Sequence, residues 1–277
     1  MIAPFVDQAW LSDHPGAVLA DVRWGLGSGP KRDDYARGHL PRAVFVDLDH
    51  DLAAHAADPS GGGRHPLPTP EAFAAAMARL GIGDGDTVVA YDDDCGAIAA
   101  RLVWMLRATG RDAAVLDGGI AAWAGELEPG EVHRTPATFT ARPWPADRIV
   151  SIADTDGRLG TVLDARAPDR FAGAADGVDP RPGHIPGSRS LPCRGHVGAD
   201  GRLLPTAALV QRFAAVGVGP DDPIVASCGS GVTACLNLLV AEHVGLGTAR
   251  LFPGSWSQYS RDDAWPVATG ADPAGLS

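Results

Sequence analysis

The stretch PIVASCGSGVTACLNLLVA, residues 223–241, decides the fold of this chain. It begins with the apolar run Ile224–Ala226, which has the length of a strand, and ends in an apolar segment from Ala234 onwards that is long enough for a helix. Between the two lies the segment CGSGVT, residues 228–233. The stretch therefore predicts a strand, a tight loop and a helix, with a cysteine as the first residue of the loop.

The residue types in this loop indicate chemistry at Cys228. Gly229 and Gly231 allow the backbone to curl so that successive N–H groups point inward, and the helix N-terminus behind them adds positive potential. A thiol in such a loop ionises more readily than a free one. We therefore predict that Cys228 is a nucleophile. The competing interpretation, a small buried hydrophobic residue, is the one we apply to Cys235 on the helix.

Composition limits the class of protein. The chain has 277 residues, of which 45% are hydrophobic, and a formal net charge of −11, which argues against an electrostatic nucleic-acid binder. No apolar run approaches the roughly 18–20 residues that span a membrane, and the N-terminus lacks the basic start of a secretory signal. The four cysteines show neither CxxC nor zinc-ligand spacing. We expect no metal, no organic cofactor, no membrane contact and a cytoplasmic location.

The chain carries an internal repeat, because a series of short motifs in the first half recurs in the same order in the second. The period is much longer than that of a solenoid and indicates a domain duplication. The matched pairs are Val18–Arg23 with Val162–Arg166, Gly38–Pro41 with Gly183–Pro186, Leu67–Pro70 with Leu204–Thr206, Val88–Tyr91 with Ile224–Ser227, and Asp117–Trp123 with Phe252–Trp256.

Each half alternates short apolar strands with helical patterns, which predicts an α/β fold with mainly parallel sheets flanked by helices. Thr69 and Thr206 are the expected N-caps of one helix in each half, and Gly81 and Gly217 the expected helix stops. A Pro- and Gly-rich stretch separates the halves, so we predict domains at 1–136 and 149–277 with a linker at 137–148.

The repeat breaks at the cysteine loop. Aligning the two halves places Asp92 of the first half opposite Cys228 of the second, within Tyr91–Asp94, where three acidic residues should favour neither a thiolate nor a bound anion. The sequence predicts one working domain and one domain without a nucleophile. Cys95 lies too late in the loop to replace it and is expected to be a packing residue.

Two such repeats, a first loop without cysteine and the segment CGSGVTA at 228–234 resemble the tandem rhodanese-domain family, in particular its 3-mercaptopyruvate sulfurtransferases. The resemblance covers about Val18 to Tyr259. It implies two tandem rhodanese-like domains, with His39 and His184 as framework residues. It further implies that sulfur passes from 3-mercaptopyruvate to Cys228 as a persulfide, with release of pyruvate, and then to cyanide, a thiol or a thioredoxin-like protein.

The resemblance also assigns roles to individual residues. Ser230, His65 and Asp49 match the serine, histidine and aspartate that surround the family's nucleophile. The loop N–H groups of Gly229, Gly231, Val232 and Thr233 would hold the transferred sulfur.

Two arginines are expected to bind the carboxylate of the donor. Arg170 matches the family's first donor arginine. The family's second arginine falls nine residues further on, where this chain has Asp179, and Arg181 is the available substitute.

Three other functions remain open on the sequence. A thiosulfate sulfurtransferase of the same fold typically has cationic residues after the cysteine, where this chain has Gly229 and Ser230, so we expect 3-mercaptopyruvate to be preferred. A cysteine phosphatase needs an arginine six residues after the cysteine, at the position of Ala234. A non-enzymatic sulfur carrier would keep Cys228 but would not need Arg170.

Overall fold

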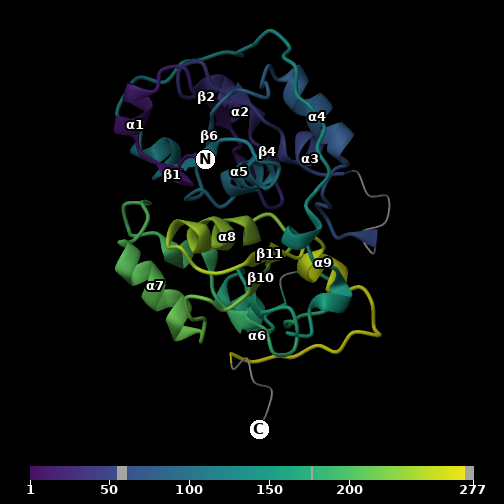
Figure 1. Cartoon of the computed structure of the whole chain (residues 1–277). Coiled ribbons are helices and arrows are strands. Elements are labelled where there is room, and N and C mark those ends of the chain that lie inside the picture. The colour runs from purple at the N-terminus through teal and green to yellow at the C-terminus, as the bar shows by residue number, and fades with distance from the viewer. Residues whose placement is uncertain (55–60, 176, 272–277) are drawn as a thin grey trace. The chain divides into compact units, whose positions relative to one another are not determined.

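The computed structural model describes residues 1–54, 61–175 and 177–271 of the chain (Figure 1). These residues divide into two compact units. Unit 1 holds residues 1–54, 67–145 and 197–203, and unit 2 holds residues 61–66, 146–175, 177–196 and 204–271. Each unit therefore includes a short segment from the other half of the sequence. The domain boundaries given above stay a prediction.

Unit 1 is built on a five-stranded parallel sheet with the strand order β1-β7-β6-β2-β5. Its central strands are buried along their whole length, as expected of a parallel sheet covered on both faces. A short antiparallel pair, β3 with β4, lies outside the main sheet. The strands are β1 (Phe5–Val6), β2 (Val18–Asp21), β3 (Trp24–Gly25), β4 (Gly29–Pro30), β5 (Val44–Phe45), β6 (Val88–Tyr91) and β7 (Ala113–Leu116).

Unit 2 repeats this arrangement in a four-stranded parallel sheet with the order β11-β10-β8-β9. An isolated parallel bridge between Ile149 and Leu251 stands where unit 1 has the pairing of β1 with β7. The two sheets thus have equivalent strands in equivalent order, which confirms the predicted α/β fold and its duplication. The strands are β8 (Thr161–Asp164), β9 (Arg189–Ser190), β10 (Ile224–Ser227) and β11 (Ala249–Leu251).

In each unit a buried helix follows one of the central strands in the sequence and packs against the sheet. Helix α5 (Ala99–Ala108) contacts β6 and β7, and helix α8 (Ala234–His243) contacts β10 and β11, as Figure 1 shows for α8. Residues 234–241 of α8 are all buried, and all of them except Asn237 are apolar or weakly polar, so this helix is enclosed on every side. The remaining helices are α1 (Gln8–Asp13), α2 (Arg32–Arg37), α3 (Leu48–Asp51), α4 (Pro70–Arg79), α6 (Pro168–Ala172), α7 (Thr206–Ala215) and α9 (Ser255–Tyr259), with 3-10 turns at Gly119–Ala122, Ala146–Arg148, Ile152–Asp154 and Cys193–His196.

The predicted helix ends are largely confirmed. The Thr69 side chain accepts a hydrogen bond from the backbone N–H of Ala72 and caps α4, and Gly81 and Gly217 have the left-handed backbone conformation that ends a helix. The prediction for Thr206 is wrong, because this residue is the first helical residue of α7 and Pro205 stands at the N-cap. Proline followed by threonine sets the helix entry here by its fixed φ rather than by a hydroxyl cap.

A pair of framework clusters repeats in the two units. In each, an arginine two residues after a strand bonds the strand's last aspartate and a glycine carbonyl: Arg23 with Asp21 and Gly38, Arg166 with Asp164 and Gly183. The following histidines, His39 and His184, are fully buried and donate from Nδ1 to backbone carbonyls. Both histidines therefore hold the framework together.

Candidate functional site

The cysteine loop joins β10 to α8 and is tied to the start of α9. Cys228 is buried, and its Sγ accepts a hydrogen bond from the backbone N–H of Gly231 at 3.1 Å. Its own N–H donates to the Oγ of Ser255 at 3.0 Å, and its carbonyl accepts from the N–H of Trp256. The thiol sulfur therefore lies inside the turn that its own loop makes, against the backbone N–H of Gly231.

Gly231 is the residue that the loop geometry requires. Its φ is +75°, a conformation that side chains disfavour, and a Cβ at this position would collide with the carbonyl oxygen of Pro253. The close approach of Pro253 is what brings the loop against the segment that leads into α9. The N–H of Gly231 can then point at the sulfur of Cys228.

A serine and a histidine form a buried pair beside the nucleophile. The Nδ1 of His65 lies 2.8 Å from the Oγ of Ser230, and both side chains are 8% exposed. His65 belongs to the segment 61–66 of unit 2, where the backbone N–H of Arg64 donates to the Oγ of Ser257 at 3.0 Å. A hydroxyl bonded to an imidazole can pass a proton between them.

Asp49, the predicted third member of this group, belongs to α3 of unit 1. Its carboxylate accepts from the indole N–H of Trp24 at 3.1 Å, and its backbone N–H donates to Asp47. Its placement beside His65 stays a prediction.

Two arginines and one aspartate meet over the cysteine loop. The carboxylate of Asp179 is 3% exposed and pairs with Arg64 through Nη1 and with Arg170 through Nη2, the latter at 3.3 Å. A Cβ built on Gly229 would lie 3.1 Å from the Nη2 of Arg64 and 3.7 Å from the Nη1 of Arg170. Both guanidinium groups therefore lie close to the residue that follows the cysteine.

Arg181 has different partners from those expected of a donor-binding residue. Its guanidinium nitrogens donate to four backbone carbonyls, those of Tyr259, Ser260, Asp262 and Trp265. Its own carbonyl accepts from the indole of Trp256. Arg181 thus links the end of α9 and the residues after it to the loop in which Arg181 lies. It also lines a cavity of about 140 Å³, together with Arg166, Arg170, Asp179 and Trp256.

The remaining loop residues continue the chain into α8. Val232 is buried at 3% exposure, and Thr233 is half-buried at the N-cap of the helix. Their predicted part in holding the transferred sulfur stays a prediction.

The corresponding loop of unit 1 is occupied by one of its own side chains. Asp92 is fully buried, and its carboxylate accepts four hydrogen bonds at 2.8 Å from the backbone N–H groups of Asp94, Gly96, Ile98 and Ala99. Burial raises the pKa of Asp92, and these four donors oppose the rise. The loop of unit 1 is therefore also a cradle of backbone N–H donors, and the carboxyl group of its own Asp92 fills it.

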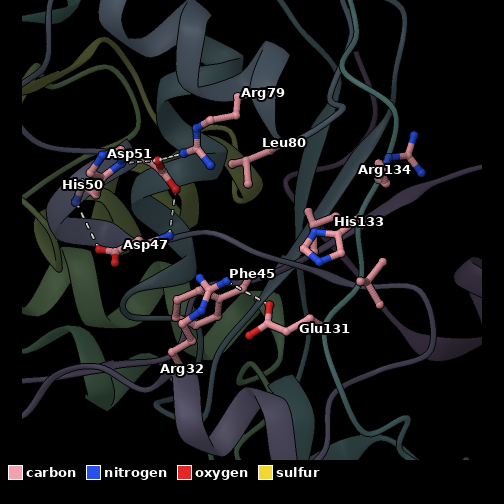
Figure 2. Close-up of a pocket in the computed structure, with 12 residues that line it drawn as sticks. Arg32, Phe45, Asp47, His50, Asp51, Arg79, Leu80, Glu131, His133 and Arg134 are labelled. Atoms are coloured by element: carbon pink, nitrogen blue, oxygen red, sulfur yellow. Dashed lines mark hydrogen bonds and ion pairs between the residues drawn. The ribbon is translucent and has the colours of Figure 1, made fainter.

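A larger cavity of about 310 Å³ lies in unit 1 and is lined by none of the residues of the Asp92 loop (Figure 2). Charged side chains line it, but they engage one another: Arg32 pairs with Glu131 at 2.9 Å, and Asp51 pairs with His50 and Arg79. Such closed ion pairs favour a structural function for the cluster. In the part of the chain that the structure describes, no group of three or more His, Cys, Asp or Glu side chains is arranged to hold a metal ion.

Sequence analysis did not identify Arg64 and Asp179 as members of this site. Arg64 directly precedes the predicted site residue His65, and Asp179 stands where the family has a donor-binding arginine. Both positions could therefore have been recognised as close to the site. Their pairing could not be inferred, because they are 115 residues apart in the chain. Across residues 1–54, 61–175 and 177–271, no helix is long and apolar enough to cross a membrane.

Comparisons with known proteins agree with this geometry. The model of the rhodanese-like domain matches the chain twice, over residues 7–126 and 147–262. The chain belongs to the rhodanese-like family and consists of two such domains in tandem. A Pseudomonas aeruginosa protein named "Probable 3-mercaptopyruvate sulfurtransferase" is 42% identical over 269 residues, covering 93% of this chain and 94% of that protein.

Two further relatives bear on the choice of donor. A Mycobacterium tuberculosis protein named "Putative thiosulfate sulfurtransferase" is 38% identical over 264 residues, covering 92% of each chain. The solved structure of a 3-mercaptopyruvate sulfurtransferase from Leishmania major superimposes with a TM-score of 0.84 at 33% identity, covering 96% of this chain and 76% of that one. The family thus includes relatives named for each of the two donors.

Proposed function

We propose that this protein is a 3-mercaptopyruvate sulfurtransferase that works through a persulfide on Cys228. The observation that carries the proposal is the position of the Cys228 sulfur against the N–H of Gly231, with the guanidinium groups of Arg64 and Arg170 beside the next residue. This arrangement offers a nucleophile, a cradle for a sulfur anion and a positive charge for the carboxylate of the donor.

In the first half-reaction the Cys228 thiolate attacks the sulfur of 3-mercaptopyruvate. The carbon–sulfur bond breaks, and its electron pair goes to the carbon as the enolate of pyruvate. The proton of the donor thiol reaches that carbon through Ser230 and His65, whose side chains are hydrogen-bonded. The products are pyruvate and a persulfide on Cys228, and Asp49 would orient His65 as its counterpart does in the family.

In the second half-reaction an acceptor thiolate, or cyanide, attacks the outer sulfur and releases the Cys228 thiolate. The N–H groups of Gly229, Gly231, Val232 and Thr233 would hold the persulfide until then. A thiol acceptor such as thioredoxin is proposed for this step, and the cytoplasm is the proposed location. Arg170 is the proposed anchor of the donor carboxylate, because it is the family's arginine and lies over Gly229.

Thiosulfate is the second candidate donor, because a 38% identical relative carries that name. The test is sulfur transfer to cyanide from each donor, measured on the wild type and on Cys228→Ser. We expect turnover of 3-mercaptopyruvate to exceed that of thiosulfate and to vanish in the variant. Equal or faster turnover of thiosulfate would reassign the donor, and no turnover of either would favour a sulfur carrier.

A further inference from the structure

The Asp179 carboxylate is a buried negative charge between two positive ones. Its side chain is 3% exposed, whereas those of Arg64 and Arg170 are 21% and 20% exposed. A carboxylate with so little exposed side-chain surface needs such partners, because an unpaired buried charge is strongly destabilising. Asp179 therefore depends on the two arginines, and the orientation of both guanidinium groups depends on Asp179.

The pair of arginines supplies the charge that the cysteine loop itself lacks. Gly229 and Ser230 are neutral, but the Nη2 of Arg64 and the Nη1 of Arg170 lie 3.1 Å and 3.7 Å from where a Cβ of Gly229 would be. A side chain at residue 229 would meet these groups, so the glycine leaves room for them. The positive potential at the nucleophile thus comes from α6 and from the segment before His65.

The three side chains sum to one positive charge. Two guanidinium groups alone would present a charge of +2 beside Cys228, and the Asp179 carboxylate removes one unit. In this partly buried setting, a change of one unit charge several ångströms away alters the local concentration of an anion about tenfold. The cavity of about 140 Å³ is lined by both Arg170 and Asp179. An anion that enters it is therefore attracted by the arginine and repelled by the aspartate.

We propose that Asp179 is the specificity-determining residue of the donor site, where it lowers the combined charge of the Arg64 and Arg170 pair beside Gly229 from +2 to +1 and so favours a donor with one carboxylate over a dianion such as thiosulfate. Arg64 is the partner that places this charge over Gly229. The inference rests on the proposed function for its choice of donors, but the charge that it assigns to the site is independent of which donor is used.

The charge can be measured by alkylation of Cys228 with iodoacetate, an anion, and with iodoacetamide, its neutral analogue, in low-salt buffer. The modified Cys228 peptide is quantified by mass spectrometry, so that other cysteines do not contribute. Asp179→Asn should raise the ratio of the iodoacetate rate to the iodoacetamide rate about tenfold, and Arg64→Gln should lower it by a similar factor. The double variant, again at +1, should return to within about twofold of the wild type.

Asp156→Asn is the matched control, because Asp156 is a surface residue of the same unit that pairs only with the exposed Arg158 among the contacts described. It changes the overall charge equally and should leave the ratio unchanged. The proposal is overturned if Asp179→Asn leaves the ratio as in the wild type, or if it changes the rates of both reagents equally. It is also overturned if the double variant behaves like Asp179→Asn.

Donor kinetics complete the test. In Asp179→Asn the ratio of kcat/KM for thiosulfate to kcat/KM for 3-mercaptopyruvate should rise about tenfold and fall again with added salt. If the wild type does not use 3-mercaptopyruvate, the proposed function fails, while the alkylation ratios still decide the charge. If the alkylation ratios do not change as expected in the variants, the charge assignment is wrong, whichever donor the protein uses.

Discussion

The imidazole of His65 and the hydroxyl of Ser230 lie 2.8 Å apart, although 165 residues separate them in the chain. Both are buried, and Ser230 follows the nucleophile by two positions in the same loop. The pair therefore places a hydrogen-bonded hydroxyl and imidazole in the loop that carries the nucleophile.

Removing either member of this pair should slow persulfide formation without preventing it. We expect His65→Gln and Ser230→Ala each to lower the rate of the first half-reaction by about 10². Because both residues act on one proton, the double variant should be little slower than either single variant. Rapid-mixing measurement of pyruvate release in a single turnover tests this. Independent effects that multiply in the double variant would contradict a shared proton path.

Gly231→Ala should destabilise the protein more than the same change at another left-handed glycine. Gly245, at the end of α8, has a φ of +72° and open space around its Cα, so Gly245→Ala should cost only the backbone strain of about 1 kcal/mol. Gly231→Ala adds the collision with Pro253 and should cost at least about 2 kcal/mol. Urea unfolding of both variants gives the comparison, and equal costs would contradict it.

Arg181→Ala should act on stability rather than on donor affinity. The variant loses the donors to four carbonyls after α9, which should lower the free energy of unfolding by about 2–4 kcal/mol. The KM for 3-mercaptopyruvate should rise less than in Arg170→Ala. Thermal unfolding and steady-state kinetics on the two variants test this. A KM that rises as far as in Arg170→Ala would return Arg181 to the donor site.

Unit 2 should lose stability as the pH falls below neutrality. Burial and the nearby Arg212 lower the pKa of His196 from 6.5 to about 4, and burial lowers the pKa of His184 as well. Between pH 6.5 and 4 the unfolded chain takes up a proton at His196 that the folded chain does not, so acidification favours unfolding. We expect His196 to account for about 2 kcal/mol of the stability lost between pH 7.5 and 5.

The variant His196→Gln keeps a donor for the carbonyl oxygen of the Asn237 amide, to which the Nε2 of His196 lies at 3.0 Å, and removes the titration. Urea unfolding at the two pH values should therefore show a smaller loss in this variant than in the wild type. Equal losses would mean that other groups cause the acid sensitivity.

Asp92→Ala should destabilise unit 1, because it leaves four backbone N–H groups, three of them buried, without their acceptor. A cost of about 3–5 kcal/mol is expected, and Asp93→Ala in the same loop should cost much less, since Asp93 is partly exposed and pairs with Lys31. Similar losses in the two variants would show that the cradle does not depend on the Asp92 carboxylate.

Those features that a short stretch of sequence encodes were predicted well. The strand, loop and helix around Cys228 follow from apolar run length and from glycine placement, and the second copy of the pattern revealed the duplicated sheet. Thr69 was recognised as a cap, whereas Thr206 was not distinguished from its neighbour Pro205. Local pattern fixes which element forms but only weakly fixes the residue at which it begins.

The side chains that join distant segments could not be predicted from local pattern. The bond between His65 and Ser230 was expected only because a related family has it. The pairing of Asp179 with Arg64 and Arg170 had no sequence signal, since an ion pair leaves no periodicity. The carbonyl partners of Arg181 had no sequence signal either, and its predicted part in donor binding stays a prediction.

Because of the Asp92 carboxyl group, the stability of the two units should depend differently on the presence of transferred sulfur. The cradle of unit 1 is filled from the moment the chain folds, whereas that of unit 2 holds only a thiol sulfur bonded to Gly231 until a second sulfur is delivered. The loop of unit 1 is thus always occupied, by a side chain of the same unit. We therefore expect the stability of unit 1 to be the same throughout the catalytic cycle, and that of unit 2 to rise when a second sulfur binds to the loop.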